Sequence, residues 1–268
     1  MLSSGEIAKK WESIAGAKAK LAPGKCFLLA VLAGAYIALG ALGFTVVRSG
    51  VEGGLGKLLG ACVFPVGLIL VALAGAELFT GNCLMAGPAA NGKVEWRGVL
   101  RSWGLAYLGN MTGALLTAAA ALFSGLMKNA ALAQAAAGIA ADKCSLSFAE
   151  ALLRGAACNM LVCGAVWMAS GAEDAGGKAA CCFFPVMLFV LCGFEHSVAN
   201  MYYIPLGLGM RLLDASSPLA DASVRLMDGF VGAVTLKNYL LNNLLPVTMG
   251  NLIGGAGLAL LYARIHRD

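Results

Sequence analysis

Charged residues are scarce in this chain, and their scarcity decides the class of protein. Asp, Glu, Lys and Arg make up 12% of the 268 residues, whereas hydrophobic residues make up 60%. A soluble globular chain carries about 25% charged residues. The sequence therefore excludes an ordinary soluble domain and predicts a protein that crosses a membrane several times.

Motifs of metal and catalytic sites are also missing. The nine cysteines form no CxxC pair and no Cys/His metal spacing, and those within apolar spans should behave as small hydrophobes. Neither GxSxG nor HExxH occurs, and an intramembrane enzyme would need a nucleophile–base pair or metal ligands that converge at membrane depth. We therefore expect no enzymatic activity, no metal and no cofactor. The net charge of +5 is explained by membrane topology and does not indicate nucleic acid.

Long apolar stretches take the place of these motifs. A hydrocarbon core of about 30 Å needs roughly 20 apolar residues per helix. The runs are continuous rather than alternating, which favours helices over a β-barrel. Six stretches qualify: Cys26–Val47, Lys57–Ala76, Trp96–Met127, Phe148–Ser170, Lys178–Phe194 and Phe230–Arg264. The sequence predicts an all-α membrane protein whose residues 26–264 form one six-helix domain.

Residues 1–25 predict an amphipathic helix that precedes the first span. Ser3 and Glu6 form a capping-box pattern, and Ile7, Trp11 and Ile14 fall on one side of the helix. Lysines elsewhere on it would face anionic lipid, while a solvated leader is the alternative. Lys and Arg are most concentrated before the first span, which places both termini, including the tail 265–268, in the cytoplasm. We expect a multi-pass protein of the cytoplasmic (inner) membrane.

An internal repeat relates the two halves of the chain. The frame G-x-E-x-x-x-x-N occurs at Gly75–Asn82 and at Gly193–Asn200, and F-P-V-x-L precedes each copy, at Phe64–Leu68 and Phe184–Leu188. G-N-x-x-G follows, at Gly109–Gly113 and Gly250–Gly254. With three spans per half, the second half enters the membrane inverted. The repeat predicts a 3+3 fold with helices two and five broken at mid-membrane and a permeation site at the repeat interface.

The predicted breaks place polar groups at membrane depth. Glu77 and Glu195 can accept hydrogen bonds from freed amides or from Asn82 and Asn200, and we favour this structural role over proton transfer. Half-helices that begin at the breaks would turn their positive ends toward the pore centre, which suits an anion. His196 could be a satisfied core histidine, or it could donate to a permeating anion or exchange a proton with it. The residues alone leave both roles open.

Four segments resemble the signature segments of the formate–nitrite transporter family: "AELFTGN", "GAACNMLVCGAVWM", "GFEHSVANMYYIP" and "NNLLPVTMGNLIGG". The resemblance spans about Cys26 to Tyr262. It implies an aquaporin-like protomer with two broken helices, assembled as a homopentamer. It also implies passage of a small monovalent anion, namely formate, nitrite or hydrosulfide, with formate the first expectation.

The same resemblance implies roles for individual residues. His196 matches the central pore histidine, with Thr80 facing it, and Asn159 matches the pore asparagine. Lys143 matches an outer-vestibule lysine that attracts anions; without the resemblance it would be taken for a solvated loop lysine. The constriction and gating residues are Phe64 and Phe189 (outer ring), Leu68 (inner ring), and Leu78 and Phe79 (gating loop). Each of these would otherwise be interpreted as ordinary packing or interhelical hydrogen bonding.

Together these features predict a mechanism. Apolar rings would block a bare anion, so a weak acid would take up a proton, from water or through His196, and cross neutral. The N-terminal helix could close the internal mouth at low pH. Two other classes are disfavoured: an aquaporin-type neutral-solute channel would carry Asn-Pro-Ala at both breaks, and that tripeptide is absent. A secondary transporter with alternating access would need more spans and a second-ion site.

Overall fold

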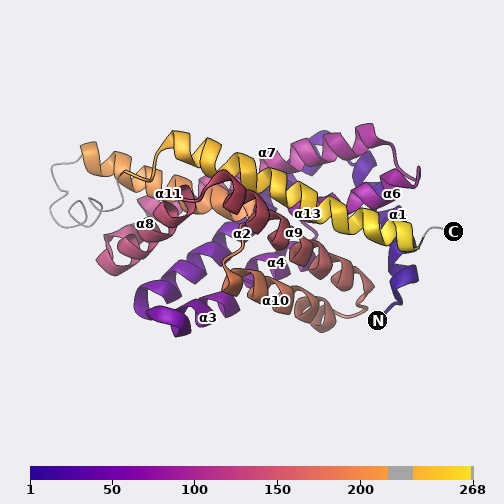
Figure 1. Ribbon diagram of the computed structural model, residues 1–268, viewed down its shortest axis with the longest axis horizontal. Coiled ribbons are helices and arrows are strands. Elements are labelled where there is room, and N and C mark those ends of the chain that lie inside the picture. Colours follow the sequence, from indigo (N-terminus) through magenta and orange to yellow (C-terminus); the bar gives the residue numbers. More distant parts are fainter. Residues whose placement is uncertain (217–231, 267–268) are drawn as a thin grey trace.

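The computed structural model describes residues 1–216 and 232–266, and these residues are helical with no strand among them (Figure 1). In the first half the helices are α1 (Ser4–Lys20), α2 (Pro23–Gly50), α3 (Gly53–Val63), α4 (Val66–Ala74), α5 (Phe79–Asn82), α6 (Ala86–Ala90) and α7 (Trp96–Phe123). Then come α8 (Ala130–Cys144), α9 (Phe148–Gly171), α10 (Ala175–Cys192), α11 (Ser197–Ser216) and α13 (Leu245–Ile265). Short 3₁₀ turns cover Cys83–Met85 and Leu126–Lys128, and a π-helix over Asn238–Leu244 leads into α13.

The predicted six spans are confirmed. Among the described residues, six helical segments are long and apolar enough to cross a membrane: Pro23–Gly50, Gly53–Ala74, Trp96–Phe123, Phe148–Gly171, Ala175–Cys192 and Asn238–Ile265. Most boundaries differ from the prediction by a few residues. The predicted start of the sixth span at Phe230 and the end of the predicted tail, residues 267–268, lie outside the described residues.

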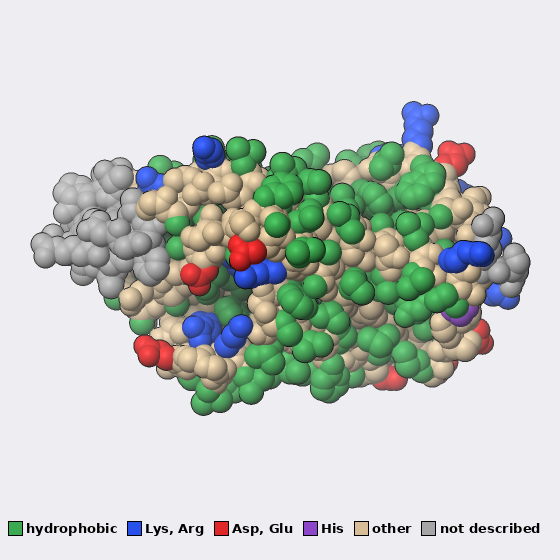
Figure 2. All heavy atoms as spheres, viewed as in Figure 1, with side chains coloured by type: hydrophobic (Ala, Val, Ile, Leu, Met, Phe, Trp, Pro, Cys, Tyr) green, Lys and Arg blue, Asp and Glu red, His purple; other side chains and the backbone are tan. Residues whose placement is uncertain are grey.

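The first and last elements lie together at one end of the molecule. Figure 1 shows both termini there, with α1 beside the end of α13. The predicted capping box is present, because the Ser3 hydroxyl accepts from the Glu6 amide while the Glu6 carboxylate accepts from the Ser3 amide. Figure 2 shows hydrophobic side chains over the broad middle of one face and charged side chains gathered toward the two ends. This surface suits a chain whose middle faces lipid.

Both G-N-x-x-G motifs mark close helix contacts. A Cβ at Gly113 of α7 would lie 1.9 Å from the carbonyl oxygen of Val31 in α2. A Cβ at Gly254 of α13 would lie 2.0 Å from the carbonyl oxygen of Ala156 in α9. Glycine is required at both places because the neighbouring backbone occupies the position of a side chain. The pairs α2–α7 and α9–α13 therefore pack in the same way in the two halves.

Two helices are interrupted at the positions where the sequence predicts breaks. α4 ends at Gly75 and α10 ends at Gly193, both glycines in the left-handed conformation with φ of 73° and 74°. The chain then crosses three extended or irregular residues before α5 and α11 begin at Phe79 and Ser197. α11 is one α-helix of 20 residues, whereas α5 has four residues and passes directly into the 3₁₀ turn Cys83–Met85 and then α6.

The F-P-V-x-L echo is not in register with this structural repeat. Phe64 is buried at 3% exposure, but its sequence counterpart Phe184 is 63% exposed. The two motifs lie at distances from their αL glycines that differ by two residues, and two residues turn a helix by about 200°. The second copy therefore points away from the interior. The G-x-E-x-x-x-x-N and G-N-x-x-G echoes carry the repeat, and the F-P-V-x-L echo does not.

Candidate functional site

Asn110 of α7 holds the first break. Its side-chain oxygen accepts from the Phe79 amide at 2.9 Å, and its Nδ2 donates to the carbonyl oxygens of Ala30 (2.8 Å) and Glu77 (2.9 Å). Phe79 begins α5, so its amide has no partner within that helix. Asn110 is completely buried. Its side chain supplies the hydrogen-bond partners that water cannot supply at this depth.

Asn251 of α13 holds the second break with the same set of contacts. It accepts from the Ser197 amide at 2.9 Å and donates to the carbonyl oxygens of Gly155 (2.8 Å) and Glu195 (2.9 Å). Asn110 and Asn251 are the asparagines of the two G-N-x-x-G motifs. Sequence reasoning identified the motifs but missed this role of their polar residue, because the bonded carbonyls lie far away in the chain.

Both glutamates of the breaks are paired with an asparagine and a lysine. Asn200 donates to Glu195 at 2.7 Å, and Lys143 donates to both oxygens of that carboxylate at 2.9 and 3.1 Å. In the first half, Asn82 donates to Glu77 at 2.8 Å. A buried carboxylate is unfavourable without partners, and these contacts supply the partners of Glu77 and Glu195.

The lysine that pairs with Glu77 is Lys18, and sequence reasoning missed it. Its Nζ lies 2.7 Å from both Glu77 oxygens. The lipid-facing surface predicted for the lysines of the N-terminal helix is therefore wrong for this residue. A signal was available: Lys18 continues the spacing of Ile7, Trp11 and Ile14 along one side of α1.

Lys143 is not a loop residue. It lies in the last turn of α8, its side chain is 14% exposed, and its Nζ stands 5.3 Å from the ring centre of Tyr203. Asn243, on the π-helix, donates to the Lys143 carbonyl at 2.9 Å. The Lys18 side chain is similarly enclosed, at 20% exposure. Both lysines are therefore held at fixed positions by the folded chain.

His196 and Thr80 meet at the centre, between the two breaks. The Thr80 hydroxyl oxygen lies 3.0 Å from His196 Nε2, and the Ala199 amide donates to His196 Nδ1 at 3.1 Å. Since Nδ1 accepts a hydrogen bond, the proton of the neutral ring is on Nε2, which donates to Thr80. The Thr80 hydroxyl hydrogen then remains available for another acceptor.

Two cavities approach this pair from opposite sides. The Lys143 vestibule has a volume of about 370 Å³ and is lined by Phe64, Phe189 and His196, among others. Its charged lining residues are Arg48, Lys57, Lys143 and Arg154 against Asp142 and Glu195. The Lys18 vestibule has about 380 Å³, and its charged lining residues are Lys10, Lys18 and Lys178 against Glu77. Basic residues outnumber acidic ones in both.

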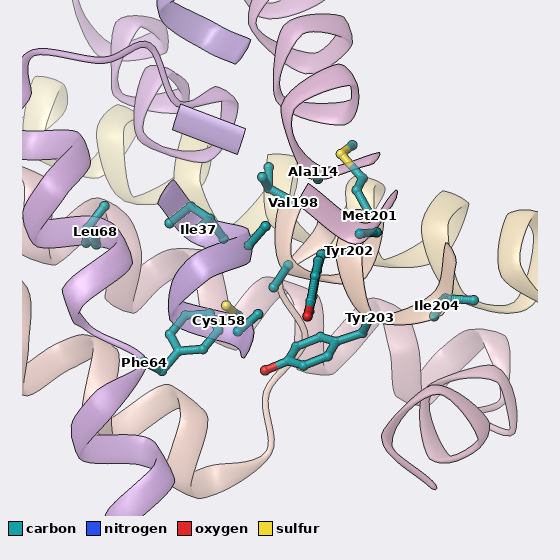
Figure 3. Close-up of a cluster of buried hydrophobic side chains, with 14 of the residues drawn as sticks. Ile37, Phe64, Leu68, Ala114, Cys158, Val198, Met201, Tyr202, Tyr203 and Ile204 are labelled. Carbon is teal, nitrogen blue, oxygen red and sulfur yellow. The ribbon is translucent and has the colours of Figure 1, made fainter. Parts of the chain in front are cut away.

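Buried apolar side chains separate the vestibules. The rings of Phe64 and Phe189 pack edge to face at 5.7 Å, and Phe189 stacks on His196 at 5.9 Å. Leu68 and Leu78 line the Lys18 vestibule. Figure 3 shows Phe64 and Leu68 within one buried apolar cluster that also includes Ile37 and Cys158. The structure thus places the predicted constriction residues between the two cavities.

Four of the predicted site residues line neither vestibule: Thr80, Asn200, Asn159 and Phe79. Asn159 is completely buried and donates to the carbonyl oxygens of Thr80 (3.2 Å) and Asn251 (2.6 Å). Phe79 packs its ring edge to face on Tyr107, with the centroids 5.0 Å apart. Asn159 and Phe79 therefore contact the framework around the centre. Because the Asn159 amide already donates to two carbonyls, it has no donor left for a permeating solute.

Comparison with known proteins identifies relatives of the whole chain. A family model described as formate/nitrite transporter matches residues 5–264. The probable formate transporter of Methanothermobacter thermautotrophicus is 39% identical over 95% of this chain and 93% of its own length. The formate channel FocA of Escherichia coli (strain K12) is 35% identical over 95% of this chain and 90% of its own.

Solved structures give the same result. A pentameric formate channel with formate bound superimposes with a TM-score of 0.81 at 35% identity, covering 92% of this chain and 98% of the other. An FNT family ion channel superimposes with a TM-score of 0.82 at 25% identity, covering 98% and 99%. These matches confirm the resemblance found in the signature segments. The chain belongs to the formate/nitrite transporter family.

Proposed function

We propose that the protein passes formate across the cytoplasmic membrane together with a proton, as a homopentamer in which each protomer has its own pore. Formate is named for the Methanothermobacter and Escherichia coli relatives, and a related solved structure is described as pentameric with formate bound. The observation that carries the proposal is the buried Thr80–His196 pair, which lies between two vestibules richer in basic than in acidic residues.

The vestibules would concentrate a small anion before it reaches the centre. An excess of positive charge in a concave, low-dielectric surface raises the local concentration of anions. Lys143 lines one vestibule and Lys18 the other, and each is bonded to the glutamate beside a helix break. Lys18 thus extends the predicted site, which contained a lysine on one side only.

The apolar separation would then require neutralisation of the anion. Phe64, Phe189 and Leu68 offer no hydrogen bond, and a bare carboxylate in such surroundings is very unfavourable. Loss of water raises the pKa of a weak acid, so formate would take up a proton as it enters. The Thr80 hydroxyl, which is free to donate, would bind the solute at the centre.

The geometry favours vestibule water over His196 as the source of the proton. A neutral imidazole cannot give up its Nε2 proton at ordinary pH, so donation would require a ring protonated on both nitrogens. The Ala199 amide points at Nδ1, and a second proton there would set two N–H groups against each other. His196 would therefore orient Thr80 and act as a hydrogen-bond donor.

Proteoliposomes loaded with a pH-sensitive dye test this function. We expect external formate to acidify the lumen with one proton per formate. His196→Gln should lower the rate but leave that ratio unchanged, whereas His266→Gln, at the only other histidine, should leave both unchanged. A changed ratio in His196→Gln would show that the ring supplies the proton. Glycerol flux without formate flux would overturn the function itself.

The same assay separates the related anions. Nitrite and hydrosulfide are also small weak-acid anions, and offering them beside formate gives their relative rates. We assign the termini to the cytoplasm from the basic residues before α2, and the two ends lie on one side of the molecule, as six spans require (Figure 1). A reporter fused to each terminus tests the orientation, and a signal from opposite sides would contradict it.

A further inference from the structure

The two halves of the site share a set of paired contacts, and the side-chain contacts to the carbonyl of Thr80 stand outside that set. The Glu77 amide donates to Leu29 and the Glu195 amide donates to Arg154, both at 3.3 Å. Likewise Asn110 donates to Ala30 and Asn251 to Gly155. These paired contacts align α2 with α9 residue by residue. One and two turns further along, Gly34 of α2 therefore corresponds to Asn159 of α9, and Ala38 to Cys163.

Only the α9 member of each pair carries a donor. Asn159 Nδ2 and Cys163 Sγ each lie 3.2 Å from the Thr80 carbonyl oxygen, and both side chains are completely buried. Gly34 and Ala38 have no polar side chain, so they offer no counterpart contact to the second break. The two donors are additions to the paired contacts of the breaks, and both reach the Thr80 carbonyl. Asn159 Nδ2 also donates to the Asn251 carbonyl at 2.6 Å, whereas the Cys163 thiol adds its contact at Thr80.

Thr80 lies where its helical segment changes type. α5 passes directly into the 3₁₀ turn Cys83–Met85, and the Cys83 amide reaches the Thr80 carbonyl as an i+3 contact shared with Gly81, so side-chain donors from α9 supplement a tightened turn. The partner residue His196 directly precedes α11, which has 20 residues. Fixing the Thr80 carbonyl against α9 fixes the orientation of the residue, and with it the hydroxyl that lies 3.0 Å from His196 Nε2.

We propose that Cys163 is a positioning residue of the permeation site: its thiol, together with the Asn159 amide, holds the Thr80 carbonyl so that the Thr80 hydroxyl faces His196 and the permeating solute. The inference rests on the proposed function, because it concerns the orientation of the group that binds the solute. It also gives a specific contact to one of the buried cysteines that were expected to behave only as small hydrophobes.

Formate flux in proteoliposomes tests the proposal through a double-mutant cycle. Cys163→Ala removes the thiol, and we expect flux to fall about two- to fivefold, the range of one modest hydrogen bond. Cys163→Ser restores a donor and should recover most of that loss. Cys26→Ala is the matched control, because the Cys26 thiol is also buried, on α2, the helix that corresponds to α9 in the first half, and Cys26 lies apart from the apolar cluster around Phe64 and Leu68. It should leave flux within a factor of about two.

The cycle with Thr80→Val separates positioning from packing. If Cys163 acts through Thr80, then Cys163→Ala has no further effect in the Thr80→Val background. Equal fold-losses in both backgrounds, or the same loss in Cys26→Ala, would overturn the proposal. Wild-type formate flux in Thr80→Val would overturn both the binding role of the Thr80 hydroxyl and this proposal, whereas absence of formate flux in the wild-type protein would overturn the proposed function. Each variant must elute as the same oligomer as the wild type, and Cys163→Val is the donor-free substitute if Cys163→Ala does not assemble.

Discussion

Replacement of Asn110 by leucine would show how much of the fold depends on one side chain at the first break. Leucine has nearly the same volume but no hydrogen-bonding group. It leaves the Phe79 amide and the Glu77 carbonyl without the partner they have now, at 2.9 Å each. The Ala30 carbonyl loses less, because it lies inside α2 and keeps its helical bond.

The magnitude can be worked out from these two groups. An unsatisfied buried polar group costs about 1–3 kcal/mol, and water cannot replace the partner at membrane depth. We therefore expect Asn110→Leu to cost about 4 kcal/mol, the sum of two such groups. For a chain of this size that corresponds to a fall of roughly 10 °C in melting temperature, at about 2–4 °C per kcal/mol.

The repeat supplies an internal comparison for this experiment. Asn251→Leu unpairs the Ser197 amide and the Glu195 carbonyl, so its loss of unfolding free energy should equal that of Asn110→Leu to within about 1 kcal/mol. Thr112→Ala is the control on α7, because the exposed Thr112 hydroxyl bonds only to Leu108 in its own helix, and it should change stability by less than about 0.5 kcal/mol. Thermal unfolding of purified protein in detergent measures all three. An Asn110→Leu variant with the same melting temperature as the wild type would refute the reasoning.

Three further changes test other parts of the structure. Lys18→Gln leaves the Glu77 carboxylate without its cation and should cost at least about 2 kcal/mol in thermal unfolding, and Glu77→Gln in the same chain should recover most of the loss; no recovery would contradict the pairing. Deletion of residues 2–20 removes α1 from the Lys18 vestibule and should abolish closure at low pH in the flux assay, so an unchanged pH response would sink that hypothesis. Gly113→Ala should destabilise the α2–α7 contact by about 3 kcal/mol, whereas Gly104→Ala, which meets nothing within 4 Å, should be neutral; equal melting temperatures would contradict the close packing.

Local patterns in the sequence were enough for the class of protein and for the spans. Hydropathy summed over about 20 residues does not depend on what lies beside a helix. It predicted six spans, and their ends fall within a few residues of the observed helix ends wherever the structure describes those ends. The Asn82–Glu77 and Asn200–Glu195 bonds join residues close in the chain, so a short motif sufficed to suggest them.

The predicted site was less complete because its partners come from distant segments. Lys18 lies 59 positions from Glu77, and nothing near Glu77 in the sequence points to α1. Asn159 was expected in the pore, yet its amide is bonded to two carbonyls from other segments. The F-P-V-x-L echo misled for a related reason, since a difference of two residues in spacing changes which side of the helix a residue occupies.

The sequence by itself determined that this chain spans a membrane six times, where two helices break, and to which family it belongs. Only the tertiary structure decided which cation neutralises Glu77, which asparagines hold the breaks, and which nitrogen of His196 carries the proton. The physical reason is one of range. Burial in lipid is an additive property of neighbouring residues, whereas a hydrogen bond depends on two atoms that meet within about 3 Å only after distant segments have packed.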